Sequence, residues 1–197
     1  MALITLNNRA INRSDTASAD DVWTATSATA TDFQAVSGGI TYASQWRVST
    51  QWNGRAVPIT ANWEQVDAHG DVAATAIIGS AMTQSSGVFT FPATGIWYIN
   101  FASTMDDENN LINQTKARIS VTMDNSNWKN GAMSQSNMPN LSYTSCNNSC
   151  NLMFDVTNTT NCKIRFEVDD DGEDAVTNLA DSGDNRTYCS FIRLGDT

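Results

Sequence analysis

Apolar and polar residues alternate in short runs along most of the chain, a pattern typical of strands with one buried face. Residues 117–123, 152–156 and 164–168 show this alternation most clearly. The last two runs flank an asparagine- and threonine-rich turn and are predicted to form a hairpin. The asparagine-rich stretch 131–148 has weak periodicity and is predicted to form long loops at one end of a sandwich. Together these patterns predict an all-β fold.

The most apolar run lies near the middle of the chain, at residues 96–101. Pro92 ends the short run before it, because proline cannot donate a hydrogen bond to a sheet. One face of the run carries Trp97, Ile99 and Phe101, and the other carries Ile96 and Tyr98. A strand that is apolar on both faces is normally covered on both. We therefore expect the first set to fill the sandwich interior and the second to face an interface. The alternative is the inverted assignment, in which Trp97 and Phe101 line a trimer axis and Ile96 and Tyr98 fill the core.

The residues around this run form a motif. They read Gly87-x-Phe89-x-Phe91-Pro92-x-x-Gly95-x-Trp97-Tyr98-x-x-Phe101. The motif resembles the centre of the complement first-component (subcomponent q) and tumour-necrosis-factor family of jelly-roll heads. The resemblance extends from about Tyr42 to the C-terminus and implies a jelly-roll β-sandwich of about ten antiparallel strands. It also implies a homotrimer without catalytic residues, in which the core motif is Phe89, Phe91, Gly95, Trp97 and Phe101 and the trimer interface includes Ile96 and Tyr98.

Residues 1–36 differ from the rest of the chain. They hold few large aliphatic side chains, and the low-complexity run 24–31 cannot build a core of its own. Residues 6–17 resemble the openings of small structural proteins of marine tailed phages, in which similar leaders precede different distal domains. We therefore predict an extended N-terminal arm over residues 1–36 and a jelly-roll head over residues 37–197. The residues expected to anchor the arm on a virion are Leu3, Ile4, Leu6, Arg9, Ile11 and Arg13.

Charge and hydropathy exclude several classes of function. The chain has 197 residues and a formal net charge of −10. Such a surface repels a phosphate backbone, so we expect no nucleic-acid binding. No apolar run is long enough to span a membrane, and the N-terminus does not resemble a signal peptide. We therefore expect no insertion into membranes. The resemblance of residues 6–17 to phage structural proteins implies a protein that is assembled in the host cytoplasm and carried in a virion.

Four cysteines leave several chemistries open: Cys146, Cys150, Cys162 and Cys189. Their even number permits disulfides, whereas the lack of a signal peptide favours free thiols. The first two could offer thiolates to zinc, but the others lie far away along the chain. We expect thiols that pack in the core or form bridges late.

An acidic run at 169–174 offers the oxygen ligands that calcium prefers. The calcium ligands would be Asp169, Asp171 and Glu173, although their spacing differs from that of an EF-hand loop. The competing interpretation is a solvated acidic loop, and we expect no bound metal or other cofactor.

Catalysis finds little support in the sequence. The single histidine, His69, precedes a glycine at a turn and has no serine or cysteine nucleophile near it in sequence. Asp106 and Glu108 could act as paired carboxylates in glycoside hydrolysis, but that reaction also needs a substrate cleft and a raised pKa. We expect no catalytic residues.

Three functions remain open. The first is a trimeric tail-fibre- or tip-like appendage of a phage virion, whose arm docks on other virion proteins. Its head would contact a host surface glycan or protein, with Tyr143 as a stacking platform. The second is a capsid decoration or cement protein with no receptor role. The third, a polysaccharide-degrading enzyme, is the least favoured.

Overall fold

The computed structural model describes residues 21–25, 31–35, 39–69, 72–73, 77–107, 114–139, 143–172 and 175–197. The chain divides into two compact units, Met1–Gly39 and Ile40–Thr197. Every helix or strand element assigned in the described residues is a strand, so the prediction of an all-β fold is confirmed.

The first unit contains an antiparallel hairpin of β1 (Asp21–Ala25) and β2 (Thr31–Ala35), with Trp23 opposite Phe33 in the register. The sequence predicted an extended arm over residues 1–36 and did not predict this hairpin within it. Aromatic and β-branched residues favour strands even where a segment is too small to build a core. The predicted anchor residues, between positions 3 and 13, lie outside the described residues, and their role stays a prediction.

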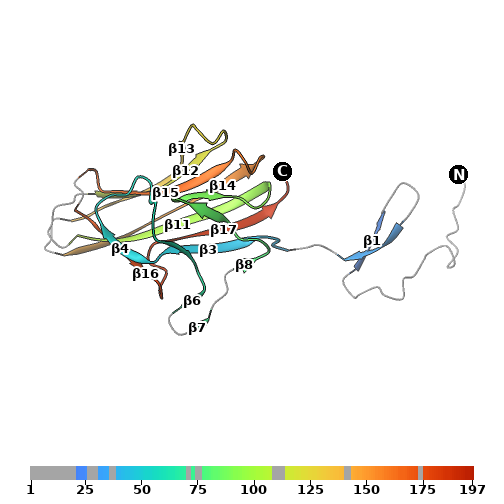
Figure 1. Ribbon diagram of the computed structural model, residues 1–197, viewed down its shortest axis with the longest axis horizontal. Coiled ribbons are helices and arrows are strands. Elements are labelled where there is room, and N and C mark those ends of the chain that lie inside the picture. The colour runs from blue at the N-terminus through green and yellow to red at the C-terminus, as the bar shows by residue number, and fades with distance from the viewer. Residues whose placement is uncertain are drawn as a thin grey trace, which may run out of the picture. The chain divides into compact units, whose positions relative to one another are not determined.

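The second unit, which we call the head, is a sandwich of two antiparallel sheets (Figure 1). The smaller sheet has five strands in the order β13 (Lys129–Asn137), β12 (Gln114–Thr122), β15 (Lys163–Asp169), β10 (Val88–Thr90) and β9 (Thr83–Ser85). From β11 onwards the chain passes repeatedly from one sheet to the other, as expected of a jelly roll.

The larger sheet is built around β11 (Gly95–Asp107). Its main path runs β4 (Thr50–Asn53), β16 (Thr177–Asp181), β11, β17 (Tyr188–Gly195), β3 (Ala43–Val48) and β5 (Trp63–Gln65). Off this path, β14 (Thr144–Val156) pairs with β11 along its full length, and β8 (Ile77–Ile78) pairs with β3. A separate two-stranded ribbon joins β6 (Ala68–His69) to β7 (Val72–Ala73).

Two expectations about the segment from 131 to 168 were wrong. The stretch predicted as loops forms most of β13 and the first part of β14, because its polar residues alternate between solvent and a hydrogen-bonded interior. The predicted hairpin between 152–156 and 164–168 does not form either. β14 pairs with β11, whereas β15 pairs with β12 and β10 in the other sheet. Alternation reveals which face of a strand is buried, but not which strand lies beside it.

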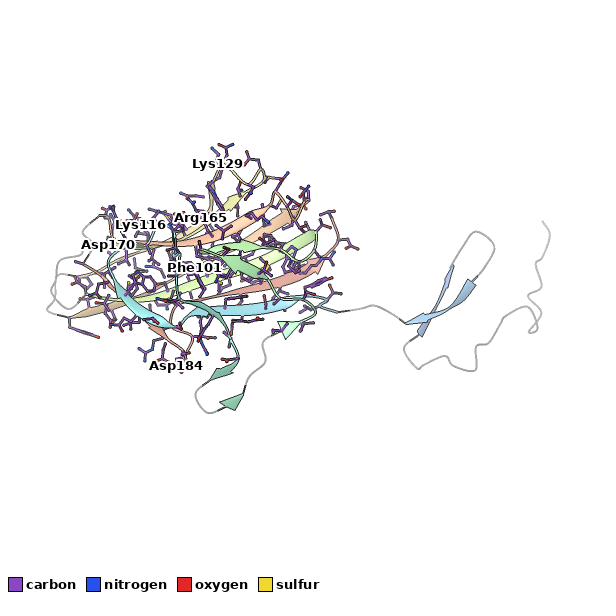
Figure 2. The ribbon with its side chains drawn as sticks, viewed as in Figure 1. Phe101, Lys116, Lys129, Arg165, Asp170 and Asp184 are labelled. Carbon is purple, nitrogen blue, oxygen red and sulfur yellow. The ribbon has the colours of Figure 1, made fainter. Side chains whose placement is uncertain are left out.

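Aromatic rings fill the core between the sheets. The ring centroid of Phe89 lies 5.2 Å from that of Trp63 and 5.4 Å from those of Phe166 and Phe191. Figure 2 shows Phe101 inside the sandwich, where its centroid lies 4.8 Å from that of Phe166. All five residues of the central motif are buried: Phe89, Phe91, Gly95, Trp97 and Phe101. A buried ring of this kind stabilises the fold by about 1.5–3 kcal/mol.

Candidate binding surface

The outward face of the larger sheet carries the residues expected at an interface. Along β11, Trp97, Ile99 and Phe101 are at most 1% exposed. Ile96 and Tyr98 alternate with them and are half-buried. Successive residues of a strand point to opposite faces, so Ile96 and Tyr98 point away from the core.

Tyr98 belongs to a row of apolar residues that crosses this face. Residues directly opposite one another on neighbouring strands share a face of the sheet. From strand to strand the register reads Met153, Tyr98, Ile192, Ala43 and Ile78. We call these five residues the apolar row. Met153 is 64% exposed and Ile78 47%, and a pocket of about 300 Å³ opens beside Ile78 and Ile192.

The same face becomes polar further along the strands. Here the register reads Ser145 of β14, Asp106 of β11, Thr177 of β16 and Asn53 of β4. We call these four residues, with Tyr143, the polar end. At about 3.3 Å per residue along β11, Asp106 lies roughly 26 Å from Tyr98.

The carboxylate of Asp106 organises the polar end. Asp106 is 6% exposed, and its Oδ1 accepts a hydrogen bond from Ser145 Oγ at 2.5 Å. Its Oδ2 accepts one from the Tyr143 hydroxyl at 2.9 Å. Tyr143 is nevertheless 57% exposed, more than any other aromatic residue whose burial the structure describes. The hydroxyl is therefore fixed while much of the ring faces solvent.

The interior behind the polar end is polar too. Asn148 is fully buried and donates from Nδ2 to Thr115 Oγ1 at 2.8 Å. It accepts from Ser136 Oγ at 2.9 Å, while Thr115 Oγ1 lies 3.0 Å from Cys146 Sγ. Most of these residues come from the stretch predicted as loops. Sequence reasoning missed them because a hydrogen-bonded polar interior leaves no hydrophobic period to detect.

The four cysteines are free thiols. Burial raises the pKa of Cys150 to about 11, and it also raises the pKa values of Cys146 and Cys189. A thiol must lose its proton to bind zinc or act as a nucleophile, and burial opposes this step here. Among the described residues, no group of three His, Cys, Asp or Glu side chains is placed to hold a metal ion.

The acidic turn after β15 lies at the end of the sandwich that Lys116 and Asp170 mark in Figure 2. Arg118 Nη2 donates to Asp169 Oδ2 at 2.7 Å, and Lys116 Nζ donates to Asp171 Oδ1 at 2.7 Å. The hydrogen bond from Lys116 holds the pKa of Asp171 below its ordinary value. Two of the three predicted calcium ligands are thus paired with cations. The third, Glu173, lies outside the described residues, and the calcium site stays a hypothesis.

Asp106, Glu108 and His69 are the candidate catalytic residues of the sequence. Both carboxylate oxygens of Asp106 accept hydrogen bonds from neighbouring side chains. Its suggested partner Glu108 lies outside the described residues, and of His69 only the backbone in β6 is described. The structure therefore does not bring these residues together in a described site.

The outward face of the smaller sheet is charged but internally paired. Glu167 Oε1 accepts from Ser120 Oγ at 2.9 Å and from Arg165 Nε at 3.0 Å. The guanidinium of Arg165 also lies 4.4 Å from the ring centre of Trp128. On this face Glu167 thus joins Ser120 and Arg165 in one hydrogen-bonded group.

Comparison with known proteins identifies the fold. No family model matches the chain, and no curated protein matches its sequence. The crystal structure of murine APRIL at pH 5.0 superposes with a TM-score of 0.54 at 12% identity, covering 78% of this chain and 98% of that one. The structure of Eiger TNF from S. frugiperda superposes with a TM-score of 0.53 at 10% identity, covering 80% and 95%.

The head is a tumour-necrosis-factor-like jelly roll. This agrees with the resemblance carried by the central motif, and it confirms the predicted fold class. At such low identity the likeness concerns the fold alone, because one fold serves many functions. The structure contains, in its described residues, no helix of the length and apolarity that a membrane span requires.

Proposed function

We propose that this protein is a trimeric appendage of a phage virion, a tail-fibre- or tip-like binding protein without enzymatic activity. The apolar row is the observation that supports the trimer, whereas the virion role rests on the resemblance of residues 6–17 to phage structural proteins. A monomer leaves Met153 64% and Ile78 47% exposed to water. Full burial of such a side chain contributes about 1.5–3 kcal/mol, and a closed ring of three copies buries the row of every copy.

Charge repulsion opposes this association but does not outweigh it. Each chain carries a formal net charge of −10. At physiological ionic strength the screening length is about 8 Å, so exposed charges on separate subunits interact weakly. Apolar burial at the interface is not screened by salt.

The arrangement of the head suits an appendage. The chain enters the larger sheet at Ala43, which belongs to the apolar row, and leaves β4 at Asn53, which belongs to the polar end. The first strand of the head therefore begins in the apolar row. The polar end is the opposite tip, available to a host surface.

Light scattering on the full chain tests the trimer. We expect three times the monomer mass of 21.4 kDa. Tyr98→Glu places a carboxylate in the apolar row and should give folded monomers, because burying an unpaired charge is costly. A wild-type protein that stays monomeric at micromolar concentration would overturn the proposed association.

A shortened chain that begins at Ser37 tests the arm. We expect it to fold as a soluble head, because the unit Ile40–Thr197 contains the aromatic core formed by the described side chains. It should no longer be found on purified virions. Recovery of the shortened chain on virions would refute docking through the arm, and electron microscopy of labelled particles would separate a tail position from a capsid decoration.

A further inference from the structure

We infer that the polar end is a binding site for a neutral sugar, with the Tyr143 ring as the surface on which the sugar stacks. This inference rests on the proposed function of host contact and names the ligand class and the site. It is carried by the fixed but exposed ring of Tyr143, by the uncharged hydrogen-bonding groups on the same face of the sheet and by the charge of the site.

The ring of Tyr143 is prepared for stacking. Its hydroxyl donates to Asp106 Oδ2, and Asp106 is itself held by Ser145 Oγ. Since Asp106 is 94% buried in this arrangement, the anchor is part of the sheet and not a loose surface contact. A ring that is already fixed loses little conformational entropy when a ligand binds. An aromatic face with a polar tip suits a sugar, which has both C–H faces and hydroxyls.

Uncharged hydrogen-bonding groups lie on the same face of the sheet. Asn147 lies on the same face of β14 as Ser145 and is exposed. Its Nδ2 donates to Thr104 Oγ1 at 3.0 Å, the one side-chain hydrogen bond that it makes within the described residues. The side-chain oxygen and second N–H of Asn147 are therefore available to sugar hydroxyls. Thr177 and Asn53, paired through a 3.2 Å hydrogen bond, extend this surface on the other side of β11.

The charge of the site selects for a neutral ligand. A sulfated or carboxylated glycan would approach the Asp106 carboxylate and a chain of net charge −10. A protein partner is also disfavoured, because protein interfaces concentrate several aromatic residues and arginines at their centre. The polar end offers one exposed ring among amides and hydroxyls.

Affinity electrophoresis of the full chain tests this inference. Native gels contain one of three neutral polysaccharides, dextran, galactan or mannan, or acidic alginate as a comparison. We expect at least one neutral gel to slow the wild-type protein. Tyr143→Ala should bind about tenfold more weakly, and Tyr143→Phe, which keeps the ring but loses the anchor, should lie between the two. Met133→Ala is the matched control, since Met133 is 52% exposed on the smaller sheet and should bind normally.

Three results would overturn the inference: no retardation in any neutral gel, retardation by alginate alone, or full retardation of Tyr143→Ala. Circular dichroism and light scattering on each variant establish that fold and mass are unchanged. The mass measurement also separates this inference from the proposed trimer. A wild-type monomer with Tyr143-dependent binding would remove the trimer and keep the sugar site, and an unretarded trimer would do the reverse.

Discussion

The apolar row and the polar end lie on one face of one sheet, and β11 and β14 contribute to both. In the apolar row these two strands contribute Tyr98 and Met153, which leave apolar surface in contact with water. Further along they present Asp106 and Ser145, which hydrogen-bond to each other. The antiparallel backbone pairing of β11 with β14 is the same in the apolar row and at the polar end. What differs is whether the side chains are satisfied within one subunit, and this decides which end needs another copy of the chain.

The interior of the sandwich also changes from apolar to polar between these two regions. Behind the apolar row, β14 contributes Phe154 to the aromatic core, where its ring centroid lies 5.8 Å from that of Phe91. Behind the polar end, the same strand contributes Asn148 and Cys146 to a hydrogen-bonded cluster. Rigidity at one end thus comes from packed rings, and at the other from satisfied polar groups.

The largest expected effect is loss of association from a charge in the apolar row. Met153→Glu should keep the fold, because this side chain is 64% exposed in the single subunit. It should give monomers in light scattering, since the interface would have to bury a carboxylate. Asn147→Glu is the matched control on the same face of β14 and should keep the trimer mass. Dissociation of both variants would extend the interface over the polar end, and dissociation of neither would contradict association through the row.

A smaller effect, on stability, is expected at the polar end. Asp106→Ala removes the shared acceptor of Tyr143 and Ser145 and should lower the free energy of unfolding by about 1–3 kcal/mol. Urea denaturation measures this change. Asp155→Ala is the control, because Asp155 is exposed on the same face near Ile96 and should change stability by at most about 0.5 kcal/mol. If the free energy of unfolding fell equally in both variants, the hydrogen bonds of Asp106 would add no stability beyond that of an exposed surface carboxylate.

The thiol of Cys150 lies where the interior of β14 turns from apolar to polar. Burial raises its pKa from 9.0 to about 11 in the folded chain, so the unfolded chain loses this proton first as the pH rises. The protonated Cys150 thiol therefore makes its full contribution to the free energy of unfolding below about pH 9, and this contribution is lost as the pH rises towards 11. The stability difference between wild type and Cys150→Ala, measured in urea, should therefore change over this window. A difference that is constant from pH 8 to 11 would contradict this.

No effect is expected from removing metal. The carboxylates of Asp169 and Asp171, at the end of the sandwich that holds the polar end, are already paired with Arg118 and Lys116. The melting temperature should therefore be the same with EDTA and with added calcium. A melting temperature that falls with EDTA and recovers with calcium would establish the acidic turn as a calcium site.

Much of the fold could be predicted from the sequence. The alternation of residues 96–101 indicated which side chains enter the core, and Trp97, Ile99 and Phe101 are buried there. The central motif pointed to a jelly roll, which the similarity to solved structures supports. The strands of the asparagine-rich stretch were missed, because β13 turns Ser136 inward and β14 turns Asn148 inward, and such polar inward residues leave no apolar period.

The candidate site could not be predicted as a unit. Its residues come from four strands and from Tyr143 just before β14, and nothing in their sequence positions relates Asn53 to Asp106 or Thr177. Tyr143 could be singled out as a ring in a polar segment. Its anchor could not, because the hydrogen bond to Asp106 depends on the pairing of β11 with β14.

The sequence by itself determined the faces of the strands, the aromatic core of the head and the contrast between that head and residues 1–36. It could do so because side-chain direction in a strand alternates with a period of two, whatever the partner strand is. Only the tertiary structure decided which strands pair, and so that Met153, Tyr98, Ile192, Ala43 and Ile78 form one row and that Asp106 lies beside Ser145. Register and sheet order come from packing between distant segments, which a local period does not encode.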